Sequence, residues 1–338
     1  MRGADVGEEK QKFLEVRDLS VRYETKEETV YAVNGVSFSL EKGRTLGLVG
    51  ETGAGKTTIA RAILGILPSP PAVVGGGEIL LGGDDILGAS EREMHDIRGN
   101  RVTMIFQDPM TALNPVMTIG RQIEEVIESH ERVSKDEARK RAEEMLEMVG
   151  ILAERYSEYP HQFSGGMKQR VVIAIALACN PDLLLADEPT TALDVTIQAQ
   201  VLDLMKTLHK KQNTSTILIT HDLGVVSEMC DEVAIVYAGE IVEMGSLEDI
   251  FERPAHPYML GLLGAIPAID GDEEKLSPIP GMTPDPTSLP PGCKFHPRCK
   301  YAAEACKSEP VGMKEIAPGH FCRCLNLAAP NLAAREAE

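Results

Sequence analysis

The stretch that decides the fold is Gly50-Glu51-Thr52-Gly53-Ala54-Gly55-Lys56-Thr57. It matches the phosphate-loop pattern G-x-x-x-x-G-K-[ST], whose glycines let successive backbone N–H groups point inward at phosphate oxygens. An apolar strand is expected before it at residues 46–49, and a helix after it from Lys56 to about Leu67. A chance glycine-rich turn is a poor alternative in that setting. Lys56 is predicted to reach the β- and γ-phosphates of a nucleotide, and Thr57 to bind Mg²⁺.

Apolar strands and amphipathic helices alternate along the chain after the phosphate loop. Residues 183–186, 217–220 and 233–236 are short apolar runs typical of buried parallel strands. Residues 134–137 have the form of a capping box, and apolar side chains follow at helical spacing up to Val149. This alternation predicts an α/β fold with a mostly parallel sheet. The remaining strands are expected near the N-terminus, at residues 13–16, 30–33 and 36–40.

An acidic pair, Asp187 and Glu188, follows the apolar strand at residues 183–186. A carboxylate at the end of a buried strand can hold Mg²⁺, usually through water, which suits Asp187. Glu188 would then polarise the attacking water. Alone, such a pair could be a helix N-cap, but after a matching phosphate loop it indicates the second half of a nucleotide site.

The sequence Ser164-Gly165-Gly166 lies just before an apolar helix expected at residues 171–178. A Ser-Gly-Gly at a helix start forms a second anion-binding N-terminus. The phosphate loop already supplies one phosphate-binding site, so the nucleotide it binds needs no second such site in the same chain. The second site is therefore expected to serve a nucleotide held by another subunit.

The phosphate loop, the Ser-Gly-Gly element and the acidic pair are followed by Ala192-Leu193-Asp194 and by a lone His221 after a strand. The order and approximate spacing of these motifs are those of a known family. In this the chain resembles the ATPase subunits of ABC transporters over roughly residues 13–265. The resemblance implies a P-loop NTPase fold in which residues 1–265 form an ABC nucleotide-binding domain. A helical subdomain is expected within it at about residues 108–170.

The resemblance also implies roles for single residues. Tyr23 would stack on adenine, although a strand residue that packs on the sheet is the alternative. Gln107 would sense Mg²⁺ and the γ-phosphate and contact the membrane subunits, and His221 would contact the γ-phosphate. Asp194 would communicate across a dimer of motors, and Thr58 would complete the phosphate site. Lys56, Gln107, Glu188 and His221 are the predicted catalytic residues, and Thr57, Gln107 and Asp187 the predicted Mg²⁺ ligands.

One departure from the family pattern lies around the Ser-Gly-Gly element. The commonest form is Leu-Ser-Gly-Gly-Gln, whereas Phe163 and Met167 flank the glycines in this chain. Phosphate binding is expected to survive because Ser164, Gly165 and Gly166 supply the hydroxyl and N–H donors. Met167 is expected to weaken the contacts that a glutamine would make.

Prolines crowd the chain after about residue 266, and five cysteines follow in the last fifty residues. Residues 266–338 are therefore expected to form a Pro-rich linker and a cysteine-rich C-terminal domain. This tail resembles that of peptide-importer motor subunits, as do His256-Pro257-Tyr258 and Gly120-Arg121-Gln122-Ile123. Related importers of nickel share much of the pattern, so the solute stays open between peptides and nickel.

Four thiolates in such a tail suit either Zn²⁺ or an iron–sulfur cluster. Structural zinc usually uses tighter cysteine pairs, so the wide spacing and the resemblance together favour a [4Fe–4S] cluster, with zinc as the alternative. Cys322 competes with Cys324 for the fourth ligand position. The expected ligands are Cys293, Cys299, Cys306 and Cys324.

Charge and hydropathy limit the other functions. The 338 residues include 34 basic and 52 acidic side chains, a net charge of −18, which argues against nucleic-acid binding. No stretch approaches the about 20 apolar residues that span a bilayer, and no signal peptide is recognised. A soluble ABC ATPase of DNA repair or translation is the alternative function. An iron–sulfur sensor with a degenerate ATPase conflicts with the full set of catalytic residues.

The resemblance implies partners and a location for the chain. A second ABC ATPase subunit is expected, preferably a different one in a heterodimer. Two transmembrane permease subunits and an extracytoplasmic solute-binding protein complete the expected assembly. The chain would then lie at the cytoplasmic face of the cell membrane, held there through the permeases.

Overall fold

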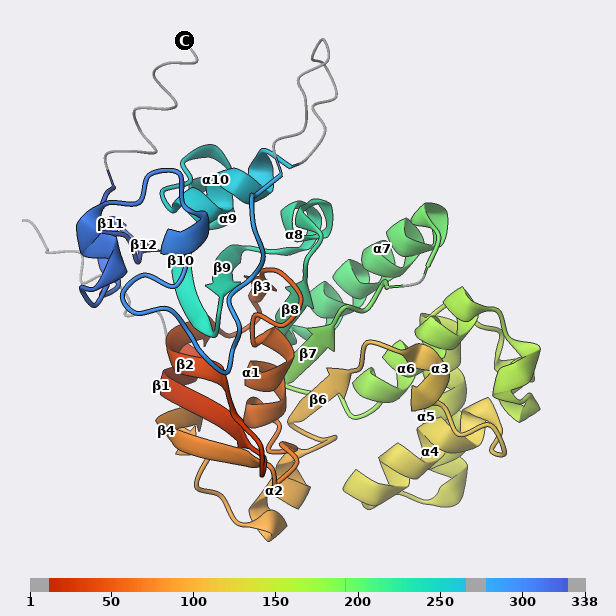
Figure 1. Ribbon diagram of the computed structural model, residues 1–338. Coiled ribbons are helices and arrows are strands. Elements are labelled where there is room, and N and C mark those ends of the chain that lie inside the picture. The colour runs from red at the N-terminus through yellow and green to blue at the C-terminus, as the bar shows by residue number, and fades with distance from the viewer. Residues whose placement is uncertain (1–11, 192, 266–277, 328–338) are drawn as a thin grey trace, which may run out of the picture.

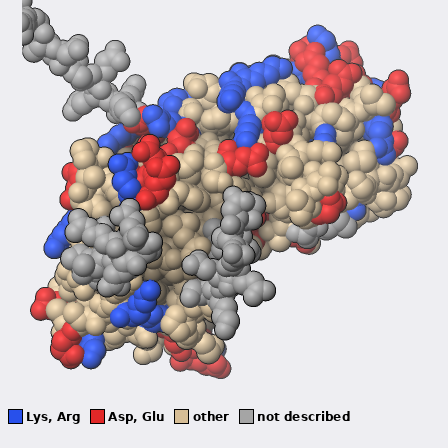
Figure 2. All heavy atoms as spheres, turned by 90° about the horizontal axis from the view of Figure 1, so that it is seen from above, with Lys and Arg blue, Asp and Glu red and all other residues tan. Residues whose placement is uncertain are grey.

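The computed structural model describes residues 12–191, 193–265 and 278–327 (Figure 1). Ala192 of the Ala-Leu-Asp motif lies outside these residues, and so does the segment just after the expected domain boundary at residue 265. Among the described residues, no helix is long and apolar enough to cross a membrane. Acidic and basic side chains are interspersed over the face that Figure 2 shows.

A central sheet carries the phosphate loop. Within the described residues its strand order is β11 (Lys314–Ala317), β12 (His320–Cys322), β10 (Glu240–Ser246), β9 (Glu232–Tyr237), β3 (Thr45–Val49), β8 (Ser215–Thr220), β7 (Leu183–Asp187) and β6 (Val102–Ile105). The strands from β9 to β6 run parallel, while β10, β12 and β11 add antiparallel pairs at one edge. The predicted α/β fold with a mostly parallel sheet is therefore confirmed.

A second, antiparallel sheet forms from the N-terminal part of the chain. Its order is β2 (Thr29–Glu41), β1 (Lys12–Glu24), β4 (Ala72–Leu81) and β5 (Asp84–Asp85). The separate strands expected at 30–33 and 36–40 are one long strand that pairs with β1, for example Val16 with Phe38. The irregular register along β1 and β2 explains the break in their apolar alternation.

The helix after the phosphate loop, α1 (Lys56–Ile63), is shorter than predicted. Gly65 adopts a left-handed φ of 65° and its N–H bonds to the Ala62 carbonyl, while Ile66 N–H bonds to the Arg61 carbonyl. Such a glycine ends a helix because it satisfies the last carbonyls at no steric cost. The expectation that the helix reaches Leu67 was therefore wrong.

A helical lobe follows β6, at the end of the molecule away from β11 and β12 (Figure 1). Ser134 caps its α5 by accepting a hydrogen bond from Glu137 N–H at 3.2 Å, and the predicted apolar face, including Ala138 and Leu146, is buried. The Ser-Gly-Gly element opens α6, which begins six residues before the predicted apolar run. The helices of the lobe are α3 (Pro109–Ala112), α4 (Ile119–His130), α5 (Lys135–Met148) and α6 (Gly165–Leu177), with 3-10 turns at Ala153–Ser157 and Pro160–Gln162.

Two apolar cores lie on either side of the central sheet. One fills the space between that sheet, α1 and the antiparallel sheet. The other lies on the opposite face of the central sheet, where it joins the helical lobe to the helices on that face. It includes Phe295 of the C-terminal extension (residues 278–327). The extension thus packs into the same core as the rest of the chain. The other helices are α2 (Glu91–Ile97), α7 (Val195–Gln212), α8 (Leu223–Met229), α9 (Leu247–Glu252) and α10 (Pro257–Leu263), with 3-10 turns at His296–Arg298 and Glu304–Lys307.

Candidate nucleotide-binding site

Several of the predicted site residues come together because they follow neighbouring parallel strands. The phosphate loop follows β3, His221 follows β8, Asp187 ends β7 and Gln107 follows β6. Carboxyl ends of parallel strands meet at one edge of a sheet, where α/β proteins bind ligands. An open pocket with a volume of about 340 Å³ lies there. It is lined by Tyr23, Val30, Ala32, residues 52–58, Gln107, Asp187, Glu188 and Pro286.

The phosphate loop needs its glycines for steric reasons. Gly55 has a φ of 102°, and a Cβ there would lie 2.3 Å from the Ala32 carbonyl oxygen. A Cβ on Gly50 would lie 2.1 Å from the Val236 carbonyl oxygen. Side chains at either position would push the loop off the sheet, so the tight curl that points N–H groups at phosphates depends on glycine.

Lys56 is buried beneath this loop. Its Nζ donates to the carbonyl oxygens of Gly50 at 2.6 Å and Glu51 at 3.0 Å. Burial lowers the pKa of Lys56, and the nearby carboxylates of Glu188, Asp187 and Glu51 oppose that fall. The ammonium is thus held against the loop backbone, next to the space that phosphates would fill.

Two of the predicted Mg²⁺ ligands are in direct contact. Thr57 Oγ1 donates to Asp187 Oδ1 at 3.2 Å. Burial raises the pKa of Asp187, and the hydrogen bond from Thr57 offsets part of that rise. A hydroxyl and a carboxylate side by side form the kind of oxygen-rich pair that Mg²⁺ prefers, so the residues present fit the metal.

Glu188 has three side-chain partners. Gln107 Nε2 donates to its Oε2 at 2.8 Å, Thr191 Oγ1 donates to the same oxygen at 2.9 Å, and His221 Nδ1 lies 2.9 Å from its Oε1. Burial alone would raise the pKa of Glu188, but the partners, led by His221 and Thr191, lower it on balance. The carboxylate is therefore held ionised and in a fixed orientation.

Thr191 is a site residue that was not predicted from the sequence. The sequence signal for Thr191 was its position three residues after Glu188. The backbone turns back at this point, where Glu188 has a left-handed φ of 47°. Thr191 N–H bonds to the Glu188 carbonyl at 3.1 Å, which closes that turn.

Tyr23 lies at the edge of the pocket, on β1. Its hydroxyl is 3.2 Å from Thr58 Oγ1, and it lines the pocket together with Val30 and Ala32. Both aromatic stacking and packing against the sheet are compatible with this position. Tyr23 and Thr58 thus line the same pocket as the phosphate loop.

Ser164, Gly165, Gly166 and Asp194 do not line this pocket. Ser164 and Asp194 cap the starts of α6 and α7, where Asp194 Oδ1 accepts from Ile197 N–H at 3.0 Å. The structure therefore separates the predicted site residues into a phosphate pocket and a second group at two helix starts.

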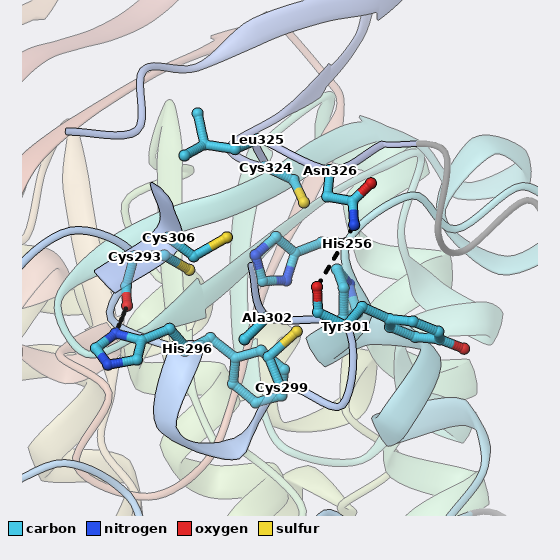
Figure 3. Close-up of a pocket in the computed structure, with 12 residues that line it drawn as sticks. His256, Cys293, His296, Cys299, Tyr301, Ala302, Cys306, Cys324, Leu325 and Asn326 are labelled. Atoms are coloured by element: carbon cyan, nitrogen blue, oxygen red, sulfur yellow. Dashed lines mark hydrogen bonds between the residues drawn. The ribbon is translucent and has the colours of Figure 1, made fainter. Parts of the chain in front are cut away.

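The C-terminal cysteines surround a second, small pocket (Figure 3) with a volume of about 10 Å³. Cys293, Cys299, Cys306 and Cys324 line it, whereas Cys322 lies in β12 and does not. Burial raises the pKa of the Cys293 thiol to about 11, and the three other lining thiols add to that rise. Among the described residues, no three His, Cys, Asp or Glu side chains lie close enough together to hold a single metal ion.

The fold and the phosphate pocket define an ABC-type ATPase cassette. The family model described as ABC transporter matches residues 33–191, and that described as Oligopeptide/dipeptide transporter, C-terminal region, matches residues 242–306. A similar solved structure is the dimeric post-hydrolysis state of the ATP-binding cassette MJ0796 bound to ADP and Pi. It is 28% identical with a TM-score of 0.62, and covers 69% of this chain and 98% of that one.

The chain belongs to the ATP-binding proteins of the oligopeptide/dipeptide branch of ABC transporters. It is 50% identical to the oligopeptide transport ATP-binding protein OppD of Bacillus subtilis, over 96% of this chain and 92% of the relative. It is 50% identical to the dipeptide transport ATP-binding protein DppD of the same organism, over 93% and 94%. OppD of Escherichia coli is 47% identical, over 92% of each chain. The predicted family is therefore confirmed, and with it the ATPase activity of a transporter motor rather than that of a soluble repair or translation factor.

Proposed function

We propose that this chain hydrolyses ATP to drive uptake of peptides through separate permease subunits. The observation that carries the proposal is the Glu188 carboxylate, held by Gln107, Thr191 and His221 next to the Thr57–Asp187 pair. Relatives at about half identity are named for oligopeptide and dipeptide transport, which supports peptides over nickel as the solute.

Each side chain of the pocket then has a distinct task. Lys56 holds the β- and γ-phosphates by exchanging its loop carbonyl partners for phosphate oxygens. Thr57 and Asp187 would hold Mg²⁺, which would supply positive charge against the developing phosphate charge. Glu188, kept ionised by its donors, orients the attacking water and accepts its proton. Gln107 and His221 contact the Mg²⁺ and γ-phosphate region, and Tyr23 packs on the adenine.

The second group of predicted site residues supports a paired motor. Ser164, Gly165, Gly166 and Asp194 lie outside the pocket of their own chain, at helix N-termini that suit an anion. In a head-to-tail pair they would close over the nucleotide of the partner motor. We infer a heterodimer with a related motor, bound to two permeases at the cytoplasmic face and fed by an extracytoplasmic solute-binding protein.

The substitution Glu188→Gln tests the motor assignment in the assembled transporter. We expect ATP binding to persist while steady-state hydrolysis falls at least about 100-fold, because a general base contributes that much or more. Glu252→Gln, an exposed residue of α9, is the matched control and keeps wild-type turnover. Wild-type turnover in Glu188→Gln would contradict the assignment. ATPase stimulation by peptide-loaded but not nickel-loaded binding protein would identify the solute.

We also propose that the cysteine pocket holds a [4Fe–4S] cluster through Cys293, Cys299, Cys306 and Cys324. All four thiols line one pocket, which supports this set and disfavours Cys322 as a ligand. A single tetrahedral zinc with Zn–S bonds of about 2.3 Å needs sulfurs about 3.8 Å apart. A four-iron cluster holds its thiolates farther apart, one at each iron.

Metal analysis of the complex, purified without oxygen, tests this proposal. We expect broad visible absorption with about four iron and four sulfide per chain. Cys324→Ser should lose the iron, while the matched variant Cys322→Ser should retain it. One zinc without iron would replace the cluster by a zinc site, and iron loss in Cys322→Ser alone would reverse the ligand choice.

A further inference from the structure

Arg298 of the C-terminal extension reaches the phosphate loop. Its Nη1 and Nη2 bind the two carboxylate oxygens of Glu51 at 2.8 and 3.1 Å. The guanidinium side chain is only 6% exposed, and its Nε donates to the Pro280 carbonyl at 3.0 Å. Such a two-point ion pair fixes orientation as well as distance. It joins residues that are 247 positions apart in the sequence.

Three further hydrogen bonds hold the backbone of Glu51. Its N–H donates to Tyr258 Oη at 3.0 Å, and its carbonyl oxygen accepts from Lys56 Nζ at 3.0 Å and from Ala54 N–H at 3.2 Å. The residue that Arg298 holds is therefore the same one that contacts the phosphate-binding lysine. A shift of the Glu51 backbone would move both the lysine's carbonyl partner and the first turn of the loop.

The surroundings make this contact rigid. Tyr237, Tyr258 and Phe295 form an aromatic cluster with ring centroids 4.6 to 5.4 Å apart, and Arg298 Nη1 donates to Tyr237 Oη at 3.4 Å. The same extension touches the nucleotide pocket a second time, because Pro286 lines it and accepts a hydrogen bond from Tyr31 N–H at 2.9 Å. The extension is thus part of the wall around the phosphate loop.

Arg298 also neutralises the negative charge of Glu51. Glu51 lies in the loop that cradles the anionic phosphates, and its carboxylate attracts Lys56. Without Arg298 this carboxylate would repel the incoming phosphates and compete with them for the ammonium. Charges a few Å apart in a partly buried site interact more strongly than they do in bulk water. Neutralisation and anchoring therefore both favour nucleotide binding.

We propose that Arg298 is a positioning residue through which the C-terminal extension sets the ATP affinity of the motor. It acts by anchoring and neutralising Glu51, so that the phosphate loop and Lys56 are preorganised before ATP arrives. This inference rests on the proposed nucleotide site. It assigns to the extension a direct effect on the phosphate loop that does not depend on what the cysteine pocket holds.

Steady-state ATPase kinetics and equilibrium binding of a fluorescent ATP analogue, both in the assembled transporter, test the proposal. We expect Arg298→Ala to raise the KM and the Kd for nucleotide about tenfold, while kcat stays within about twofold of the wild-type value. This pattern is expected when the lost interaction stabilises the ground state and the transition state equally. Arg298→Lys should recover part of the loss, since an ammonium keeps the charge but not the fork. Lys307→Ala is the matched control, because Lys307 pairs with Glu304 inside the extension.

A double-mutant cycle with Glu51→Gln identifies the route. If Arg298 acts through the Glu51 carboxylate, Arg298→Ala should have little further effect in the Glu51→Gln background. An undiminished effect there, or an unchanged KM in Arg298→Ala, would overturn the proposal. Should Arg298→Ala fail to assemble, an unchanged KM in Arg298→Lys would overturn it equally. If wild-type transporter itself shows no saturable ATP binding, the proposed function fails rather than this inference.

Discussion

Glu188 is held by residues from three separate parts of the fold. Gln107 comes from the end of β6, His221 from the end of β8, and Thr191 from the turn after Glu188 itself. Hydrogen bonds to the ionised form of a carboxyl lower its pKa, and here they outweigh the opposite effect of burial. The proposed general base is thus kept ionised by its neighbours, and each neighbour should affect the pH at which activity is lost.

The substitution Thr191→Val tests this at the residue scale. It removes one donor to the carboxylate, so the pKa of Glu188 should rise and the carboxylate should protonate at higher pH. The acid limb of the pH profile of kcat should therefore move to higher pH, by less than about one unit for a single neutral donor. The measurement is kcat against pH at saturating ATP.

Thr207→Val is the matched control for that profile. Thr207 bonds only the Asp203 carbonyl of its own helix among the contacts described, far from the pocket. Its acid limb should coincide with that of the wild type. An unmoved limb in Thr191→Val would mean that another group sets the acid loss of activity.

At the scale of elements, α6 and α7 begin in close contact. A Cβ on Gly166 would lie 2.4 Å from Ile197 Cγ2, whereas a Cβ on the adjacent Gly165 meets nothing within 4 Å. Gly166→Ala should lower the free energy of unfolding by about 1–3 kcal/mol through overpacking. Gly165→Ala is its matched control and should not destabilise the chain. Urea titrations of both full-length variants make the comparison, and equal midpoints would show that the two helices separate without cost.

Elements and site residues differed in how far the sequence predicted them. Buried parallel strands were predictable because each is a short apolar run, and the site residues because their motifs follow those strands. The end of α1 was missed because Gly65, a helix stop signal in the sequence, was included in the predicted helix, whereas its left-handed φ ends the helix before it. The pair of Arg298 and Glu51 was missed because nothing in either local sequence indicates a partner 247 residues away. Long-range ion pairs depend on the fold as a whole.

At the scale of the whole molecule, the extension and the cassette share one sheet and one core. β12 pairs with β10, and Phe295 packs against Tyr237 and Tyr258. Beneath this junction lies Glu243, which is fully buried. Its carboxylate accepts hydrogen bonds from Ala255 N–H at 2.7 Å and His256 N–H at 2.8 Å, and from His320 Nε2 of β12 at 2.8 Å. One buried charge therefore depends on donors from both parts of the chain.

The substitution His320→Ala tests whether the two parts unfold together. It leaves the fully buried Glu243 carboxylate one donor short, which should cost about 1–3 kcal/mol of unfolding free energy. His95→Ala, at an exposed position of α2, is the control and should change nothing. Because the cost falls on a charge shared by both parts, hydrogen exchange should accelerate in β10 and α10 as well as in β11 and β12. Faster exchange confined to β11 and β12 would instead show that the extension unfolds as a separate unit. The ion pair between Arg298 and Glu51 would then break whenever that unit unfolded.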